Sequence, residues 1–181
     1  MNSTSLNTVF NATAVFIWKP DCRYRVYVTS REIFIIRFGG QDLGSVVWHY
    51  FGAVGAVIEA LFKSRKENAL LEKIKVMDEA SPEDLLPQDK RNFKISAANI
   101  VESSLEPEKV FGGHGRHIGR WIICRSNGKK MVFELNSIEE MKTACEALPK
   151  LFGGLLKVNA QWDESQYRFV KKTDGSENGL G

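Results

Sequence analysis

The pair Asn127-Gly128 between two apolar runs constrains the fold more than any other feature of this sequence. Asn-Gly tolerates the positive φ angles of a two-residue type I′ turn, so we expect a β-hairpin closed by Ser126 and Lys129, with Arg125 opposite Lys130. Side chains alternate between the two faces of a strand, and this alternation predicts a core face and an outer apolar patch. The expected core face consists of Ile122, Cys124, Met131 and Phe133. The expected outer patch consists of Trp121, Ile123 and Val132.

An amphipathic helix is expected directly after this hairpin. Ser137 and Glu140 have the spacing of a capping box, in which each side chain accepts a hydrogen bond from the backbone N–H of the other residue. Apolar residues then recur at helical spacing until Pro149 and the pair Gly153-Gly154. These apolar residues are Ile138, Met141, Cys145 and Leu148. The sequence therefore predicts a helix over 137–150.

Alternating or uniformly apolar runs bounded by turn residues predict the remaining strands. The full set of expected strands is 13–18, 23–29, 32–38, 93–96, 100–106, 117–125 and 130–135. A charged helix is expected over 63–80, with Leu70, Ile74 and Met77 on one stripe. The sequence thus predicts an α+β chain, mainly β, with seven antiparallel strands followed by a C-terminal helix.

This order of elements resembles the pleckstrin-homology superfold, in which a helix plugs one open end of two orthogonal sheets. The stretch YRVYVTSREIFII at 24–36 looks like the second and third strands of bacterial pleckstrin-homology-like proteins. The stretch SPEDLLPQDKRNFKISAANIVESSLE at 81–106 looks like part of an uncharacterised bacterial group of that kind. The resemblance covers most of residues 13–150 and implies a seven-stranded antiparallel barrel capped by the helix. It implies little about function, because this superfold hosts lipid, peptide and protein binders alike.

The segment 43–62 is almost uncharged, and its only ionisable groups are His49 and Glu59. One alternative is a membrane span. The apolar stretch is short for a span, and the glycines at 52 and 55 reduce its apolar surface, so both features argue against this alternative. The other is a helix buried against the sheet, within a helical insertion over about 43–90. Small residues would also permit the close approach of a second helix, including one from another copy of the chain. The expected interface residues are Trp48, Gly52, Gly55 and Ile58.

The length and composition of the chain favour one soluble domain over 1–170, followed by a disordered tail over 171–181. The three cysteines are an odd number without CxxC spacing, which is typical of buried thiols in a reducing compartment. The N-terminus lacks the basic region of a signal peptide. We therefore expect a cytoplasmic protein, with membrane association as the alternative. The net charge of +3 does not by itself indicate a nucleic-acid partner, and none is expected.

His114 and His117 form an HxxH pair in a glycine loop, and a nearby carboxylate or thiolate could complete a metal site. No HExxH or CxxC motif accompanies them, so they are interpreted as exposed loop histidines and no metal is expected. Cys124 and His117 are not expected to form a catalytic pair, since the hairpin register directs the thiol into the core. The sequence has no GxSxG and no GxxxxGK[ST] motif, and we expect neither an enzyme nor a cofactor.

Two basic groups are the candidate ligand-binding residues. Lys19, Arg23 and Arg25 resemble the loose basic pattern at the first hairpin of phosphoinositide-binding pleckstrin-homology domains, where such residues converge on phosphate oxygens. The second group surrounds the central hairpin and the loop before it. Its members are His114, Arg116, Arg120, Arg125, Lys129 and Lys130. The sequence predicts a non-catalytic binding or scaffolding module that self-associates or docks on a protein, and the alternative is a peripheral membrane module that binds anionic lipid headgroups.

Overall fold

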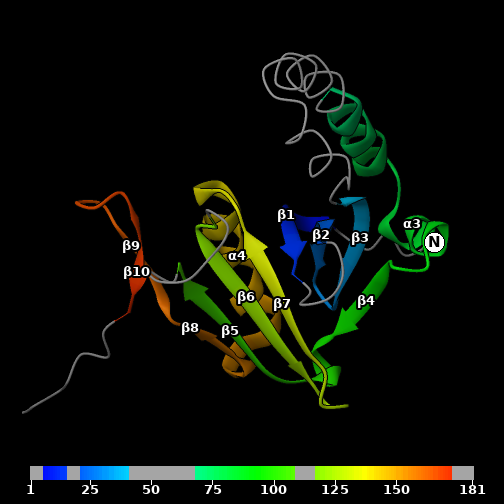
Figure 1. Ribbon diagram of the computed structural model, residues 1–181. Helices are drawn as coiled ribbons and strands as arrows, with labels where there is room; N and C mark the ends of the chain where they lie inside the picture. The colour runs from blue at the N-terminus through cyan, green and yellow to red at the C-terminus, as the bar shows by residue number, and fades with distance from the viewer. Residues whose placement is uncertain (1–5, 16–20, 41–67, 109–116, 173–181) are drawn as a thin grey trace, which may run out of the picture. The chain divides into compact units, whose positions relative to one another are not determined.

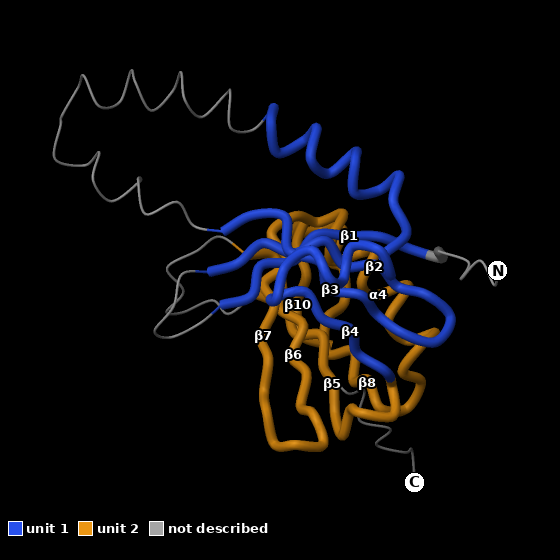
Figure 2. The backbone as a smooth tube through the Cα atoms, turned by 90° about the vertical axis from the view of Figure 1, so that its right-hand side faces the viewer, with its two compact units in different colours: residues 1–96 blue, residues 97–181 orange. Residues whose placement is uncertain are grey.

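A computed structural model of the chain describes residues 6–15, 21–40, 68–108 and 117–172 (Figure 1). The chain divides into two compact units, residues 1–96 and 97–181, which Figure 2 shows in different colours. The expectation of one domain over 1–170 stays a prediction. No helix within the described residues is long and apolar enough to cross a membrane. The expected interface residues lie outside the described ranges, and they are Trp48, Gly52, Gly55 and Ile58.

The described residues of unit 1 contain four strands that pair in an antiparallel manner. They are β1 (Leu6–Ala14), β2 (Cys22–Thr29), β3 (Glu32–Gly40) and β4 (Phe93–Ser96). Within this unit their order is β4-β3-β2-β1. The strands expected over 23–29, 32–38 and 93–96 are confirmed, apart from small differences at their ends.

The first strand begins and ends earlier than the strand expected over 13–18. β1 pairs with β2 along its length. Phe10, Ala12 and Ala14 are buried, and they alternate with the half-buried Asn11 and Thr13. Polar residues at these positions are therefore part of a period-two strand, although they interrupt the apolar run in the sequence.

A helix over 68–79 packs on one face of the strands of unit 1. The expected helical stripe is confirmed, because Met77 is buried and Leu70 and Ile74 pack against the same apolar cluster. The strands contribute Tyr27, Phe34, Ile36 and Phe38 to this cluster. The short helix α3 (Pro82–Leu85) and the 3-10 turn η1 (Leu86–Gln88) follow, and Leu85 is buried in the same cluster.

Unit 2 contains the central hairpin and the main helix (Figure 1). Its first elements are the 3-10 turn η2 (Ala97–Asn99), β5 (Ile100–Pro107), β6 (Gly119–Arg125), β7 (Lys130–Leu135) and α4 (Ile138–Phe152). The 3-10 turn η3 (Gly153–Leu155), β8 (Leu156–Val158), β9 (Ala160–Asp163) and β10 (Arg168–Lys171) complete the unit. β9 and β10 form a separate two-stranded sheet.

The arrangement of the strands corrects the expected barrel. β8 pairs with β5 in a parallel manner, whereas the other neighbours in the order β7-β6-β5-β8 are antiparallel. Among the described residues, eight strands lie in open, mixed sheet structure, and the expectation of a seven-stranded antiparallel barrel is wrong. The α+β class, the excess of strands and the helix after β7 are confirmed. β8 has only three residues, with Lys157 in the middle, so it has no distinctive sequence pattern by which it could be predicted.

The register of the central hairpin differs by one residue from the expected one. The N–H of Arg125 donates to the carbonyl of Lys129 at 2.9 Å, and the N–H of Gly128 donates to the carbonyl of Arg125 at 2.9 Å. Gly128 has a φ of 76°, and Asn127 has no positive φ, so this is a three-residue loop with a glycine bulge and not a type I′ turn. The strand pairs are Trp121 with Phe133 and Ile123 with Met131.

This shift exchanges the two faces of β6. Trp121 and Ile123 are both 0% exposed and belong to the core, whereas Ile122 and Cys124 are only half-buried. The expected core positions 122 and 124 are therefore wrong. Phe133 and Met131 lie on the core face, as expected, together with their partners Trp121 and Ile123, and Phe133 is buried whereas Met131 is half-buried. A one-residue slip moves every side chain of a strand to the other face, and burial of the tryptophan selects the observed register.

The capping box at the start of α4 is confirmed. The Ser137 hydroxyl accepts a hydrogen bond from the N–H of Glu140 at 3.1 Å, and the Glu140 carboxylate accepts one from the N–H of Ser137 at 3.1 Å. Pro149 lies inside the helix, which continues to Gly153. Gly153 has a φ of 52°, a conformation that favours glycine and ends the helix there.

The buried side of α4 packs on the tryptophan face of β6. The ring centroids of Trp121 and Phe152 are 6.3 Å apart. A Cβ added to Gly119 would lie 2.6 Å from the sulfur of Met141 and 2.9 Å from the carbonyl oxygen of Glu106. The absence of a side chain at Gly119 therefore allows α4 to approach β6 closely.

Candidate ligand-binding surfaces

Arg25, a candidate of the first basic group, is held inside unit 1 by other residues. Its Nε and Nη2 donate to the two carboxylate oxygens of Asp78 at 3.0 and 2.6 Å, and its Nη1 donates to the side-chain oxygen of Asn11 at 2.9 Å. The Tyr27 hydroxyl also donates to Asp78, at 3.0 Å. Burial, and then this hydrogen bond, raise the pKa of Tyr27 above its ordinary value. The network assigns Arg25 to the attachment of helix 68–79 and leaves it few donors for a ligand.

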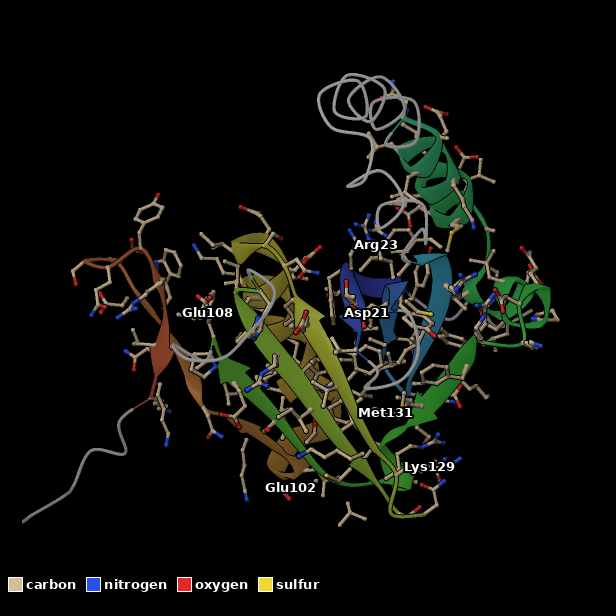
Figure 3. The ribbon with its side chains drawn as sticks, in the orientation of Figure 1. Asp21, Arg23, Glu102, Glu108, Lys129 and Met131 are labelled. Carbon is tan, nitrogen blue, oxygen red and sulfur yellow. The ribbon has the colours of Figure 1, made fainter. Side chains whose placement is uncertain are left out.

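Arg23, the second described member of this group, is exposed. Figure 3 labels it together with Asp21 at the beginning of β2. The Cβ and Cδ atoms of Arg23 lie 3.8 Å from the position that a Cβ on Gly39 would occupy. No side chain of the described residues pairs with the Arg23 guanidinium. Lys73 lies on the neighbouring helix and donates to the carbonyl of Phe38 at 3.0 Å. Arg23 is therefore available to a ligand, whereas Lys19 lies outside the described residues.

The second basic group does not form one cluster. β6 has seven residues, so its two ends lie roughly 20 Å apart. Arg125, Lys129 and Lys130 lie at the turn end, and Arg120 and His117 lie at or before the opposite end. His114 and Arg116 are outside the described residues. The structure therefore separates residues that the sequence places in one group.

At the end of β6 that lies away from the turn, positive and negative residues alternate across the strands. Arg120 pairs in register with Glu106 on β5 and with Glu134 on β7. The Nε of Arg120 is buried, and no described residue forms a hydrogen bond with it. His117 is only 4% exposed, which corrects its interpretation as an exposed loop residue, and its Nδ1 lies 3.9 Å from Glu134. Two carboxylates compensate this end of the strand, so it is a poor site for an anion.

At the turn end, no acidic side chain among the described residues forms a hydrogen bond or ion pair with the basic residues. Lys129 and Lys130 are exposed and Arg125 is half-buried, and no side chain among the described residues pairs with them. Figure 3 shows Lys129 at the turn between β6 and β7. We call Arg125, Lys129 and Lys130 the basic tip.

The described residues contain no group of three or more His, Cys, Asp and Glu residues that could hold a metal ion. Cys22, Cys124 and Cys145 form no disulfide among the described residues. Burial, and then the nearby Glu146, raise the pKa of the Cys145 thiol to about 11, which keeps it protonated at neutral pH. Cys124 lies on the half-buried face of β6 and not in the core as expected, while His117 precedes the other end of that strand.

The sequence reading missed a polar junction of unit 1 that joins β3 to the loop before β4. The Arg37 guanidinium donates to Asp89 at 3.2 Å, and the Arg37 N–H donates to the side chain of Asn92 at 2.8 Å. The backbone N–H of Arg91, and then its guanidinium, lower the pKa of Asp89 to about 2. These residues are scattered among other charges in the sequence, and only the register of β3 shows which of them meet.

Asp78 was also missed, although the helical pattern contained a signal for it. It follows Met77 and comes one turn after Ile74, so it lies beside the buried stripe of helix 68–79. A carboxylate in such a position needs a partner. The sequence alone does not indicate that this partner is Arg25.

No protein-family model matches the chain, and comparison with curated proteins and with solved structures gives no match either. The resemblance to pleckstrin-homology-like proteins therefore stays a prediction.

Proposed function

We propose that this chain is a non-catalytic binding or scaffolding module of pleckstrin-homology-like kind, which docks on a protein partner or on a second copy of itself through its helical segment. The order of the elements supports this kinship, because antiparallel neighbours run from β1 to β4 and from β5 to β7 before α4. The fold by itself does not select a ligand, so the proposal depends on exposed side chains.

The observation that carries the docking proposal is the outward side of helix 68–79. Leu70, Ile74 and Met77 occupy the stripe that packs on the strands. Leu71 and Val76 lie outside this stripe and are 57% and 65% exposed. With a rotation of 100° per residue, Leu71 and Val76 lie at the two edges of the helix side that faces away from the packed stripe. Large apolar groups on both flanks of an exposed helix side are suited to contact with another protein.

Light scattering of the full chain at increasing concentration tests this proposal. The wild type is expected to self-associate at high micromolar concentration, and the double variant L71Q/V76Q is expected to stay a monomer with an unchanged melting temperature. Gly55→Leu should have the same effect if the segment 43–62 takes part. Glu79→Gln, an exposed change on the same helix, is the control. A monomeric wild type would exclude self-association and leave docking on a different protein.

The second candidate function is that of a peripheral membrane module, and the basic tip favours it. Three cations at one turn, none of which forms an ion pair with an acidic side chain of the described residues, attract an anionic surface, whereas Arg25 is already paired with Asp78. Co-sedimentation with neutral and anionic vesicles at two salt concentrations tests this function. Binding that requires anionic lipid and weakens with salt supports it, and equal recovery with both vesicle types excludes it.

A further inference from the structure

The basic tip lies beside an exposed apolar residue. Ile100 pairs with Arg125, Glu102 pairs with Cys124, and the register of β5 against β6 is irregular between these two pairs. Val101 lies at this irregularity and is 63% exposed. A bulge re-aims a side chain out of the regular alternation, and here it presents a valine to solvent next to the cations of the turn.

The backbone holds this arrangement in place. The N–H of Ser126 donates to the carbonyl of Asn99 at 3.1 Å, which joins the turn to the residues just before β5. The side chain of Asn127 accepts from the N–H of Lys129 at 3.1 Å within the turn. The valine and the cations are therefore presented by fixed backbone and need no rearrangement before binding.

The charge around the tip is positive although an acidic residue is close by. Glu102 neighbours Val101, but Lys157 on β8 donates to its carboxylate at 2.8 Å. This hydrogen bond, with a smaller contribution from Lys130, lowers the pKa of Glu102. Since Lys157 is the main partner of Glu102 and Lys130 contributes less, the net charge of Arg125, Lys129 and Lys130 with this pair stays positive.

We propose that the basic tip and Val101 form a membrane-docking element, in which the cations bind the headgroups of an anionic bilayer and the valine enters the interfacial layer. This inference rests on the second candidate function and assigns it a site. Cations flanking an apolar residue are the combination that suits the boundary between headgroups and acyl chains. An acidic peptide would satisfy the cations but would give the valine no apolar environment.

Binding of the full chain to phosphatidylcholine vesicles with and without phosphatidylserine tests the site. Each cation near an anionic surface contributes about fivefold in partitioning, so Lys129→Gln combined with Lys130→Gln is expected to weaken binding about 25-fold. Val101→Ser is expected to weaken it about threefold, with little dependence on salt. The double variant K171Q/K172Q removes the same charge from exposed residues elsewhere in unit 2 and is the matched control. All variants should keep the wild-type melting temperature.

Several results would overturn the proposal. An equal loss in K171Q/K172Q would show attraction by net charge alone. If Val101→Ser bound vesicles as tightly as the wild type, the valine would not take part in the contact. Competition by inorganic phosphate as strong as that by vesicles would indicate a site for a free anion, and binding of oligo-aspartate without vesicle binding would indicate an acidic protein partner. If Arg23→Gln lost vesicle binding and the variants of the basic tip did not, the membrane function would stand but its site would be at Arg23. If the wild type did not bind anionic vesicles, both the membrane function and this site would be excluded.

Discussion

The guanidinium of Arg25 and the carboxylate of Asp78 meet through two hydrogen bonds, from Nε at 3.0 Å and from Nη2 at 2.6 Å. The two residues are 53 positions apart, and their pair joins β2 to the helix over 68–79. A fork of two parallel hydrogen bonds fixes the orientation of both groups. It gives the helix a polar attachment in addition to its apolar stripe, at a position where the sequence suggests a phosphate ligand.

Asp78→Asn should lower the free energy of unfolding by about 2 kcal/mol, because it replaces a charged acceptor of three hydrogen bonds by a neutral amide. Tyr27→Phe removes only one of these bonds and should cost about 1 kcal/mol. Chemical denaturation gives both values. A double-mutant cycle with Arg25→Met should show a coupling energy near that of Asp78→Asn itself. Independent, additive losses would contradict the network.

Arg25→Gln and Arg23→Gln should separate structural from surface roles in the first basic group. Arg25 has 17% of its side chain exposed and is paired, so its loss should cost about 2 kcal/mol of stability. Arg23 is exposed and pairs with no side chain in the described part of the chain, and Arg23→Gln should change stability by less than about 0.5 kcal/mol. At a temperature where both variants are folded, Arg25→Gln should bind anionic vesicles like the wild type. Equal stabilities of the two variants would contradict the assignment of Arg25 to the network.

Local patterns predicted the elements of this fold well, but they did not predict how distant segments pair. The capping box of Ser137 and Glu140 and the stripe of Leu70, Ile74 and Met77 depend on residues within a few positions of each other, and both are confirmed. The parallel return of β8 to β5 depends on residues more than fifty positions apart. No local pattern specifies such a pairing, and a barrel was expected in its place.

The candidate sites were limited in the same way. Sequence spacing identified the exposed Arg23 and the basic tip, in which Lys129 and Lys130 are exposed and Arg125 is half-buried. The cations of the tip have no acidic residue between them in the sequence. Sequence spacing also included Arg25 and Arg120, whose neighbours Asp78, Glu106 and Glu134 come from other elements. Whether the charge of a strand residue is compensated depends on its partners across the sheet, and these are known only once the register is known.

The acid side of the stability profile should depend on Asp89. Its pKa is about 2 in the folded chain, below the ordinary value of 3.8, because Arg91 and Arg37 donate to the ionised form. A lowered folded pKa contributes stability that is complete above the unfolded pKa and is lost as the pH falls through the folded pKa. The stability difference between wild type and Asp89→Asn should therefore shrink from about pH 4 to about pH 2. Urea denaturation across this range measures it, and a constant difference would show that Asp89 does not titrate there.

The register of the central hairpin predicts opposite consequences for two adjacent isoleucines. Ile123 is 0% exposed on the face that packs under α4, and Ile123→Ala should cost about 3 kcal/mol through loss of buried area and the cavity left behind. Ile122 is half-buried on the other face, pairs with Val132, and should cost about 1 kcal/mol when changed to alanine. The type I′ register reverses this order, since it points Ile122 into the core. Denaturant midpoints of the two variants, with equal denaturant slopes, therefore distinguish the registers, and a larger loss at Ile122 would show that the three-residue loop at 126–128 is wrong.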